Sequence, residues 1–397
     1  MRPLVRKAIL ALFPPLRRII SQRNQLLLQV QAAAGTNDSS RISHRLYSTL
    51  NVNPAIGSGN SADDIRIVER LLKAYQRSPP DQYGDGSMWR DFFELHHKGF
   101  HTVFMSGDVN GARRILADPG SGNLFYGFDE LCAMFRASYQ GSPGGLANSC
   151  QDNLIRLAEA IGAFQIDCPE QPPVRWQENI EVRTDDILRA IETALGAQLS
   201  FPDIYAGIVG ANSMRGVIPY RAIQAIYLAF RMRQLAPERA AEEPRICEIG
   251  AGLGRSALHA RQLGLRNYTI VDVPMTVISQ GYYLMRCLGA DAVALPGEPR
   301  SSPGQIRLIY PDEFLASEDR FDLIANVDSL TELGRDLATK YLKTISVKTP
   351  AFLSINHEAN PIRVNALLKD LDRPYRVSRH PYWMRQGYVE EFVEFQA

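Results

Sequence analysis

A glycine-rich segment and a later acidic residue have the spacing of a nucleoside pocket. Arg245 to Ile249 is predicted to be a short buried strand, and Gly250 to Gly254 follows it as a turn with little side-chain bulk. The next predicted strand ends in Asp272. An acid about 20 residues beyond such glycines can accept hydrogen bonds from both hydroxyls of a ribose. The spacing therefore predicts a pocket for an adenosine compound.

Glu248 indicates which adenosine compound the pocket would hold. An NAD-binding turn reads G-x-G-x-x-G and faces a pyrophosphate, whereas Gly250 to Gly254 gives G-x-G-x-G, with Arg255 in the last place. A carboxylate two residues before the first glycine would repel a pyrophosphate but suits a ligand that carries an ammonium and a sulfonium. The pattern favours S-adenosylmethionine. Glu248 and Asp272 together argue against an ordinary strand-turn-helix corner.

The overall composition limits the class of protein. The chain has 397 residues, 45% of them hydrophobic and 22% charged, which is typical of a globular protein long enough for two domains. Lys and Arg number 44 against 43 Asp and Glu, so no net basic field favours a nucleic acid. The five cysteines lack a metal-like spacing, which indicates free thiols. No apolar run is long enough for a membrane span or a secretory signal, so a cytoplasmic location is expected.

The N-terminal segment is basic, although the whole chain is not. Its first acid is Asp38, and six basic residues come before it: Arg2, Arg6, Lys7, Arg17, Arg18 and Arg23. Such an amphipathic stretch could make a weak peripheral contact with anionic lipid or with an acidic partner. The favoured alternative is a helical tail that packs on a neighbouring element or on a second subunit of a homo-oligomer.

The hydrophobic pattern divides the chain into three regions. Residues 1–60 are predicted to form the tail and a linker, 61–200 a mostly α-helical domain that shapes the acceptor site, and 201–397 the cofactor-binding domain. From Pro244 onward, strands and helices alternate, which predicts an α/β fold with a mostly parallel sheet. The predicted strands are Arg245 to Ile249, Tyr268 to Asp272, Ile306 to Tyr310, Phe321 to Val327, Ala351 to His357, Tyr375 to Ser378 and Tyr388 to Phe395.

Polar residues follow two further strands of this predicted sheet. Ligands of open α/β sheets lie at the carboxyl ends of the strands. Asp328, Ser329 and Glu332 follow one strand, and the segment Asn356 to Asn360 ends the next. These groups are therefore expected beside the methyl donor, where a hydroxyl acceptor needs a general base.

Histidine matches that task best, so His357 is the predicted base, with Glu358 beside it. Asp328 could be the base instead, or could orient His357. An alternative role for Asp328, Glu332 and Glu358 is to hold a divalent ion, but the sequence alone does not bring them together, and no metal site is predicted.

Two loops are further candidates for ligand contacts. The segment Gly207 to Gly216 is glycine-rich and polar, and could fold over S-adenosylmethionine so that Arg215 contacts its carboxylate. A plain interdomain loop explains the same composition. Trp383, in Arg379 to Gly387, could stack on a sugar ring or close the core.

The order of these motifs resembles that of the bacterial sugar O-methyltransferases, a family of class I S-adenosylmethionine-dependent methyltransferases. The resemblance covers about Ser61 to the C-terminus. It rests on these segments: Cys247-Glu-Ile-Gly-Ala-Gly-Leu-Gly-Arg255, Tyr268-Thr-Ile-Val-Asp272, Ser354-Ile-Asn-His-Glu358, Tyr382-Trp-Met-Arg-Gln-Gly-Tyr388 and, more weakly, Leu124-Phe-Tyr-Gly-Phe128.

The resemblance implies a Rossmann-like seven-stranded methyltransferase sheet. It also implies transfer of a methyl group from S-adenosylmethionine to a hydroxyl of a sugar or glycosylated acceptor, by in-line displacement with a general base. The residues expected to bind the cofactor are Glu248, Gly250, Ala251, Gly252, Gly254, Asp272, Val273, Asp328 and Arg215. The alternatives are an NAD-dependent Rossmann enzyme acting on a nucleotide sugar, and a non-catalytic scaffold subunit that binds the cofactor or nothing.

Overall fold

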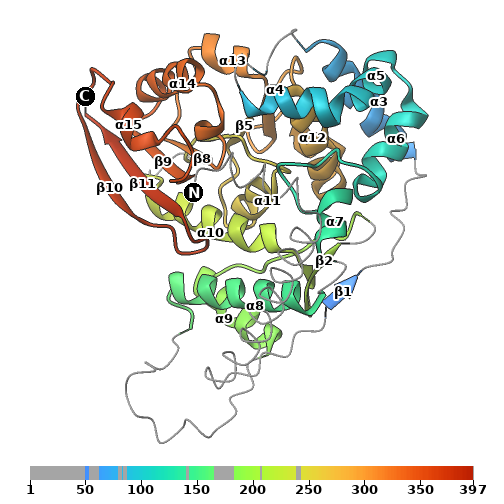
Figure 1. Cartoon of the computed structure of the whole chain (residues 1–397), viewed down its shortest axis with the longest axis horizontal. Coiled ribbons are helices and arrows are strands. Elements are labelled where there is room, and N and C mark those ends of the chain that lie inside the picture. The colour runs from blue at the N-terminus through green and yellow to red at the C-terminus, as the bar shows by residue number, and fades with distance from the viewer. Residues whose placement is uncertain are drawn as a thin grey trace, which may run out of the picture. The chain divides into compact units, whose positions relative to one another are not determined.

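The computed structural model describes residues 50–52, 62–78, 83, 87–139, 143–164, 183–205, 208–237 and 243–396 (Figure 1). The basic N-terminal segment, with its predicted lipid or subunit contact, lies outside these residues. Among the helices that are described, none has the length and apolar character required to cross a membrane. The predicted boundary between residues 200 and 201 stays a prediction.

A mostly parallel sheet forms the C-terminal half, in the order β10-β11-β9-β8-β4-β5-β7-β6 (Figure 1). Six of the seven predicted strands run in one direction; the exception is β11, which pairs antiparallel with β9 on one side and with the edge strand β10 on the other. The strands are β4 (Ile246–Ile249), β5 (Tyr268–Val271), β6 (Val293–Ala294), β7 (Ile306–Ile309), β8 (Leu323–Val327), β9 (Ala351–His357), β10 (Tyr375–Pro381) and β11 (Tyr388–Phe395). The α/β prediction is confirmed, and the two-residue strand β6 adds an eighth strand.

Helices cover both faces of this sheet, because a buried parallel strand carries apolar side chains on both sides. Alternation along β4 directs Cys247 and Ile249 to one face, where they join a core with residues of the three helices α13, α14 and α15. Glu248 points to the opposite face, against α11. The helices are α10 (Tyr220–Leu235), α11 (Arg255–Gln262), α12 (Pro274–Leu288), α13 (Pro311–Ala316), α14 (Arg335–Lys348) and α15 (Val364–Leu368).

The region before α10 is mostly helical, as predicted. Its helices are α3 (Ala62–Gln76), α4 (Met88–Phe92), α5 (Lys98–Ser106), α6 (Val109–Ala117), α7 (Ala133–Tyr139), α8 (Pro143–Ala160) and α9 (Thr184–Leu195). Asp64 of α3 has a fully buried carboxylate, which accepts hydrogen bonds from Tyr282 Oη at 2.9 Å and from Arg286 Nη1 at 2.7 Å. This pair of contacts fixes α3 on α12.

The structure divides one helical segment and corrects one predicted loop. A π-helical turn, η1 (Phe93–His97), separates α4 from α5. Most of the predicted loop Gly207 to Gly216 is β structure: β2 (Val209–Ser213) pairs with β1 (Leu50–Val52) and β3 (Gly216–Ile218). A Cβ on Gly210 would lie 2.1 Å from the Ile218 carbonyl oxygen, so this glycine serves close strand packing.

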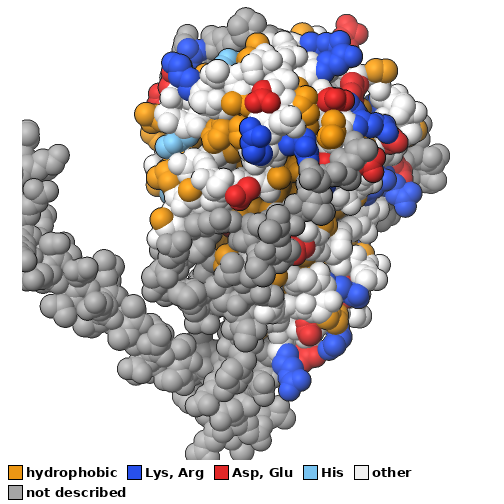
Figure 2. Space-filling model, turned by 90° about the vertical axis from the view of Figure 1, so that its right-hand side faces the viewer, with side chains coloured by type: hydrophobic (Ala, Val, Ile, Leu, Met, Phe, Trp, Pro, Cys, Tyr) orange, Lys and Arg blue, Asp and Glu red, His pale blue; other side chains and the backbone are white. Residues whose placement is uncertain are grey.

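The surface over the N-terminal helices carries mixed charge. Figure 2 shows the side of the molecule that is on the right in Figure 1, where α3, α5 and α6 lie. Lys and Arg alternate there with Asp and Glu, and hydrophobic side chains lie between them. The described part of this view therefore shows no broad area of one charge.

Candidate functional site

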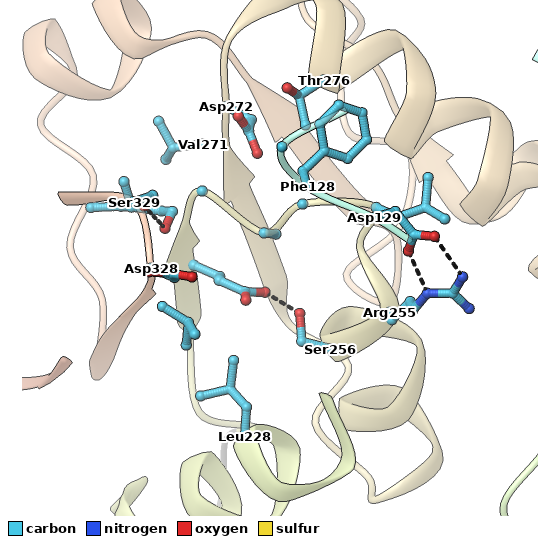
Figure 3. Close-up of a pocket in the computed structure, with 18 of the residues that line it drawn as sticks. Phe128, Asp129, Leu228, Arg255, Ser256, Val271, Asp272, Thr276, Asp328 and Ser329 are labelled. Carbon is cyan, nitrogen blue, oxygen red and sulfur yellow. Dashed lines mark hydrogen bonds and ion pairs between the residues drawn. The ribbon is translucent and has the colours of Figure 1, made fainter. Parts of the chain in front are cut away.

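A cavity of about 140 Å³ lies at the carboxyl ends of β4, β5 and β8 (Figure 3). The glycine turn after β4 forms one wall, as the sequence predicts. Residues of α10 and the segment Gly127–Asp129 form a second part of the lining, and Trp89, Tyr341 and Tyr382 also contribute. The site is thus built from the sheet together with segments that precede and follow these strands in the chain.

The glycines of the turn are required by its geometry. Gly250 and Gly252 have φ values of 73° and 57°, which side chains other than glycine rarely adopt. A Cβ on Gly250 would also lie 2.1 Å from Ser329 Oγ, and one on Gly252 would lie 3.1 Å from the Phe128 carbonyl oxygen. The predicted residues Gly250, Ala251 and Gly252 all line the cavity. Their backbone is therefore exposed to a ligand at close range.

Glu248 lines the same cavity and is 2% exposed. Its Oε2 accepts hydrogen bonds from Ser256 Oγ and from Tyr268 Oη, the latter at 2.7 Å. Among the described residues, no donor bonds to Oε1. Burial raises the pKa of the Glu248 carboxyl to about 6, although the two hydrogen bonds lower it. Glu248 is therefore held in place by one oxygen while the other can accept a hydrogen bond from a ligand.

Asp272 lies across the glycine turn from Asp328, at the end of β5 (Figure 3). Its Oδ1 accepts a hydrogen bond from the Val273 amide at 2.9 Å, and its Oδ2 accepts one from Gln280 Nε2 at 2.6 Å. Burial raises the pKa of the Asp272 carboxyl to about 7, and the negative charge of Glu248 adds to this. Asp272, Val273 and Glu248 all line the cavity. The structure thus brings together the two carboxylates on which the nucleoside prediction rests.

Asp328 reaches the cavity from the end of β8. Its φ of 52° lies in the left-handed region, a strained conformation that is common at functional sites. Its Oδ2 accepts hydrogen bonds from Arg385 Nη1 at 3.0 Å and from Tyr388 Oη at 2.7 Å. Among the described residues, no donor bonds to Oδ1. The carboxylate is therefore oriented by two partners and keeps one oxygen for a ligand.

Glu332 lies one turn after Asp328, in a short 3₁₀ helix. Its Oε2 accepts a hydrogen bond from Trp89 Nε1 at 3.0 Å, and Trp89 lines the cavity. Burial raises the pKa of Glu332 to about 8, and the charge of Asp328 adds to this. The contact joins α4 to the segment after β8 at the cavity wall.

The structure does not bring His357 and Glu358 to the cavity. His357 pairs with Tyr388 across β9 and β11, and the two rings meet edge to face at 4.8 Å. Because Tyr388 in turn contacts Asp328, His357 is separated from the cavity by a side chain. Glu358 forms an ion pair with Arg379 at 2.7 Å. Among the described residues, no three His, Cys, Asp or Glu side chains cluster as a metal site.

Arg215 also lies away from the cavity lining. It lies at the turn between β2 and β3, where its Nε donates to Glu192 Oε1 at 3.0 Å. Trp383 is 53% exposed and so does not close the core, but its neighbour Tyr382 lines the cavity. Trp383 itself is not part of the cavity lining.

Sequence reasoning missed Asp129, which holds Arg255 in a buried ion pair. Arg255 Nε and Nη2 donate to Asp129 Oδ2 and Oδ1 at 2.8 and 3.2 Å, and the side chains are 8% and 1% exposed (Figure 3). The pair holds Phe128 over the glycine turn. Arg255 ends the glycine motif, and Leu124 to Phe128 belongs to the resemblance, but no local pattern links the two. Arg221 and Gln224 of α10 line the cavity and were missed as well.

The sheet is of the type found in class I methyltransferases. No family model matches the chain, and no curated protein matches it. Among solved structures, magnesium protoporphyrin IX methyltransferase from Synechocystis PCC 6803 with bound SAH is 10% identical; the match covers 45% of this chain and 84% of that chain, with a TM-score of 0.33. A TehB-like SAM-dependent methyltransferase from Corynebacterium glutamicum is 15% identical over 43% of this chain and 87% of its own, with a TM-score of 0.32. The glycopeptide N-methyltransferase MtfA complexed with (S)-adenosyl-L-methionine is 13% identical; the match covers 43% of this chain and 87% of that chain, with a TM-score of 0.32.

Proposed function

We propose that this protein is an S-adenosylmethionine-dependent O-methyltransferase. The observation that carries the proposal is that Glu248 and Asp272 face one cavity on either side of a glycine turn. Burial of both carboxyls without a cation raises the pKa of each. A ligand with a sulfonium and an ammonium would supply the missing positive charge. In this proposal Glu248 Oε1 accepts from the ammonium, and Asp272 accepts from the ribose hydroxyls.

The alternative function for the same cavity, binding of NAD by an NAD-dependent enzyme, is less favoured. A pyrophosphate beside the glycine turn would lie near Glu248, which repels it. Arg255, the one cation in the last place of the motif, is already neutralised by Asp129. Among the described residues, the glycine turn itself therefore carries no unpaired cation to offset two phosphate groups, and the remaining arginine of the lining, Arg221, belongs to α10.

For the acceptor we propose a hydroxyl of a sugar or glycosylated compound, as the family resemblance implies. Trp89 and Tyr382 line the cavity, and Trp383, which follows Tyr382 in the chain, is exposed. Aromatic faces of this kind suit the apolar face of a sugar ring. Oxygen acceptors also match the oxygens at the end of β8, because Asp328 Oδ1 can accept the hydroxyl proton.

In the proposed reaction the acceptor oxygen attacks the methyl carbon in line with the sulfur. The carbon–sulfur bond breaks, its electron pair stays on sulfur, and the acceptor proton passes to a carboxylate. Two observations support Asp328 for this role: it lines the cavity, and Arg385 and Tyr388 orient its carboxylate. The role of His357 as the base stays a prediction, with Tyr388 between it and Asp328.

Calorimetry with S-adenosylhomocysteine tests this proposal without knowledge of the acceptor. The wild-type protein is expected to bind S-adenosylhomocysteine with one site per chain and to bind NAD at least tenfold more weakly, a difference of about 1.4 kcal/mol. Binding of NAD in preference to S-adenosylhomocysteine would favour the alternative function, an NAD-dependent enzyme. Binding of neither compound by the folded protein would favour the hypothesis of a non-catalytic scaffold subunit.

The affinity for S-adenosylhomocysteine is expected to fall as the pH is lowered from about 8 to about 5. The pKa values of the empty site are raised to about 6 for Glu248 and about 7 for Asp272, so both carboxyls are ionised above this window and protonated below it. The ligand's ammonium and ribose hydroxyls require the ionised forms, so binding near neutral pH releases protons. Titrations in two buffers of different ionisation enthalpy measure that release. A constant affinity across the window would contradict the assignment of these two groups.

A further inference from the structure

Arg221 is one of two arginines in the cavity wall. It lies in the first turn of α10 and lines the cavity. Among the described residues, no carboxylate forms an ion pair with its guanidinium. Arg255, the other arginine of the cavity lining, is paired with Asp129. Arg221 therefore brings to the site a positive charge that no described carboxylate holds in a direct ion pair, although Glu130 and Glu332 lie close enough to attract it.

Gln224 lies next to Arg221 on the same face of α10, since residues three apart on a helix are neighbours. The residue is 9% exposed and lines the cavity. Its Nε2 is buried and has no hydrogen-bond partner within the described part of the chain. A buried donor without a partner costs about 1 to 3 kcal/mol. A ligand that accepts from this amide would remove that cost.

The acidic groups that face Arg221 do not neutralise it. Glu130 Oε1 accepts from the Arg221 backbone amide at 3.3 Å, which leaves the guanidinium free of that contact. Burial raises the pKa of both Glu130 and Glu332, so their negative charge is reduced at neutral pH. Asp328 is engaged by Arg385. The Arg221 guanidinium is therefore not held by a carboxylate within the described part of the chain and can donate to an anion.

We propose that Arg221 and Gln224 form an anion subsite that binds a carboxylate or phosphate group inside the cavity. A guanidinium offers two parallel donors to such a group, and the amide offers a third. This inference rests on the proposed function, because the rest of the cavity must hold an adenosyl compound. The anion is either the cofactor's own amino-acid carboxylate, which the sequence assigned to Arg215, or an acidic group of the acceptor.

The first arm of the test compares S-adenosylhomocysteine with 5′-methylthioadenosine, which lacks the amino acid. If the cofactor supplies the anion, Arg221→Met is expected to weaken S-adenosylhomocysteine binding about 30-fold or more and to leave 5′-methylthioadenosine binding unchanged. Arg221→Lys should retain part of the selectivity, because it keeps the charge. The control is the exposed Arg266→Met, which should change neither affinity. Thermal melting of each variant checks its fold.

The second arm applies if Arg221→Met binds both compounds as the wild type does. The wild-type protein, saturated with S-adenosylhomocysteine, is then titrated with uridine diphosphate and with D-glucuronate. Binding of either probe that is lost in Arg221→Met assigns the anion to the acceptor. The anion subsite is overturned if no binding in either arm depends on Arg221, or if Arg215→Met loses S-adenosylhomocysteine in its place. Failure of the wild type to bind S-adenosylhomocysteine would instead overturn the proposed function.

Discussion

Glu248→Gln is expected to weaken binding of S-adenosylmethionine and S-adenosylhomocysteine by about 2 to 5 kcal/mol, roughly 30-fold to several thousand-fold. The glutamine keeps the size of the side chain and can still bond to the hydroxyls of Ser256 and Tyr268. It removes the negative charge that would pair with the ligand's ammonium in a buried site. Calorimetry of both compounds at constant salt concentration measures the loss.

The matched control for this variant is Glu243→Gln, an exposed carboxylate shortly before β4. It should leave both affinities within about twofold, since exposed charges contribute little. An equal affinity of Glu248→Gln and wild type would remove Glu248 from the cofactor site. A loss confined to thermal stability, with unchanged affinity, would do the same and would make Glu248 a structural residue.

Asp129→Ala is expected to lower the free energy of unfolding by about 3 to 5 kcal/mol. The substitution leaves the guanidinium of Arg255 buried without its carboxylate, and the side chain of Arg255 is only 8% exposed. It should also weaken S-adenosylhomocysteine binding, because the ion pair holds Phe128 over the glycine turn. Urea unfolding with and without ligand measures both effects.

Two further variants serve as controls for the effect of Asp129→Ala on stability. The exposed Asp118→Ala should change the free energy of unfolding by less than about 0.5 kcal/mol. The double variant Asp129→Ala with Arg255→Met should recover part of the stability, because removing both charges of a buried pair costs less than removing one. If Asp129→Ala unfolds like Asp118→Ala, the pair does not hold this segment in place.

The parts of the site that the sequence predicts are those with a local pattern. Glu248 and the glycines lie within one strand and its turn, and Asp272 ends the next strand at the expected spacing. These residues are positioned by the parallel order of β4 and β5, which the alternation of strands and helices already indicates. The seven predicted strands are present for the same reason.

The missed residues depend on contacts between distant segments. Asp129 meets Arg255 across 126 positions of the chain, and no spacing rule connects them. The register of β9 and β11 sets Tyr388 opposite His357, so Tyr388 contacts Asp328 while His357 lies behind it. Arg215 is directed to Glu192 because its segment forms a β-hairpin, where glycine content alone suggested a loop. For His357 and Arg215 the residue types were recognisable, but their positions followed from strand pairing.

A crystal structure of the protein with S-adenosylhomocysteine tests the central claim most directly. The ribose hydroxyls are expected within hydrogen-bond distance of the Asp272 carboxylate, and the amino group is expected beside Glu248, with the backbone of Gly250 and Gly252 against the ligand. Electron density for the ligand elsewhere, or in this cavity with both carboxylates turned away from it, would contradict the account.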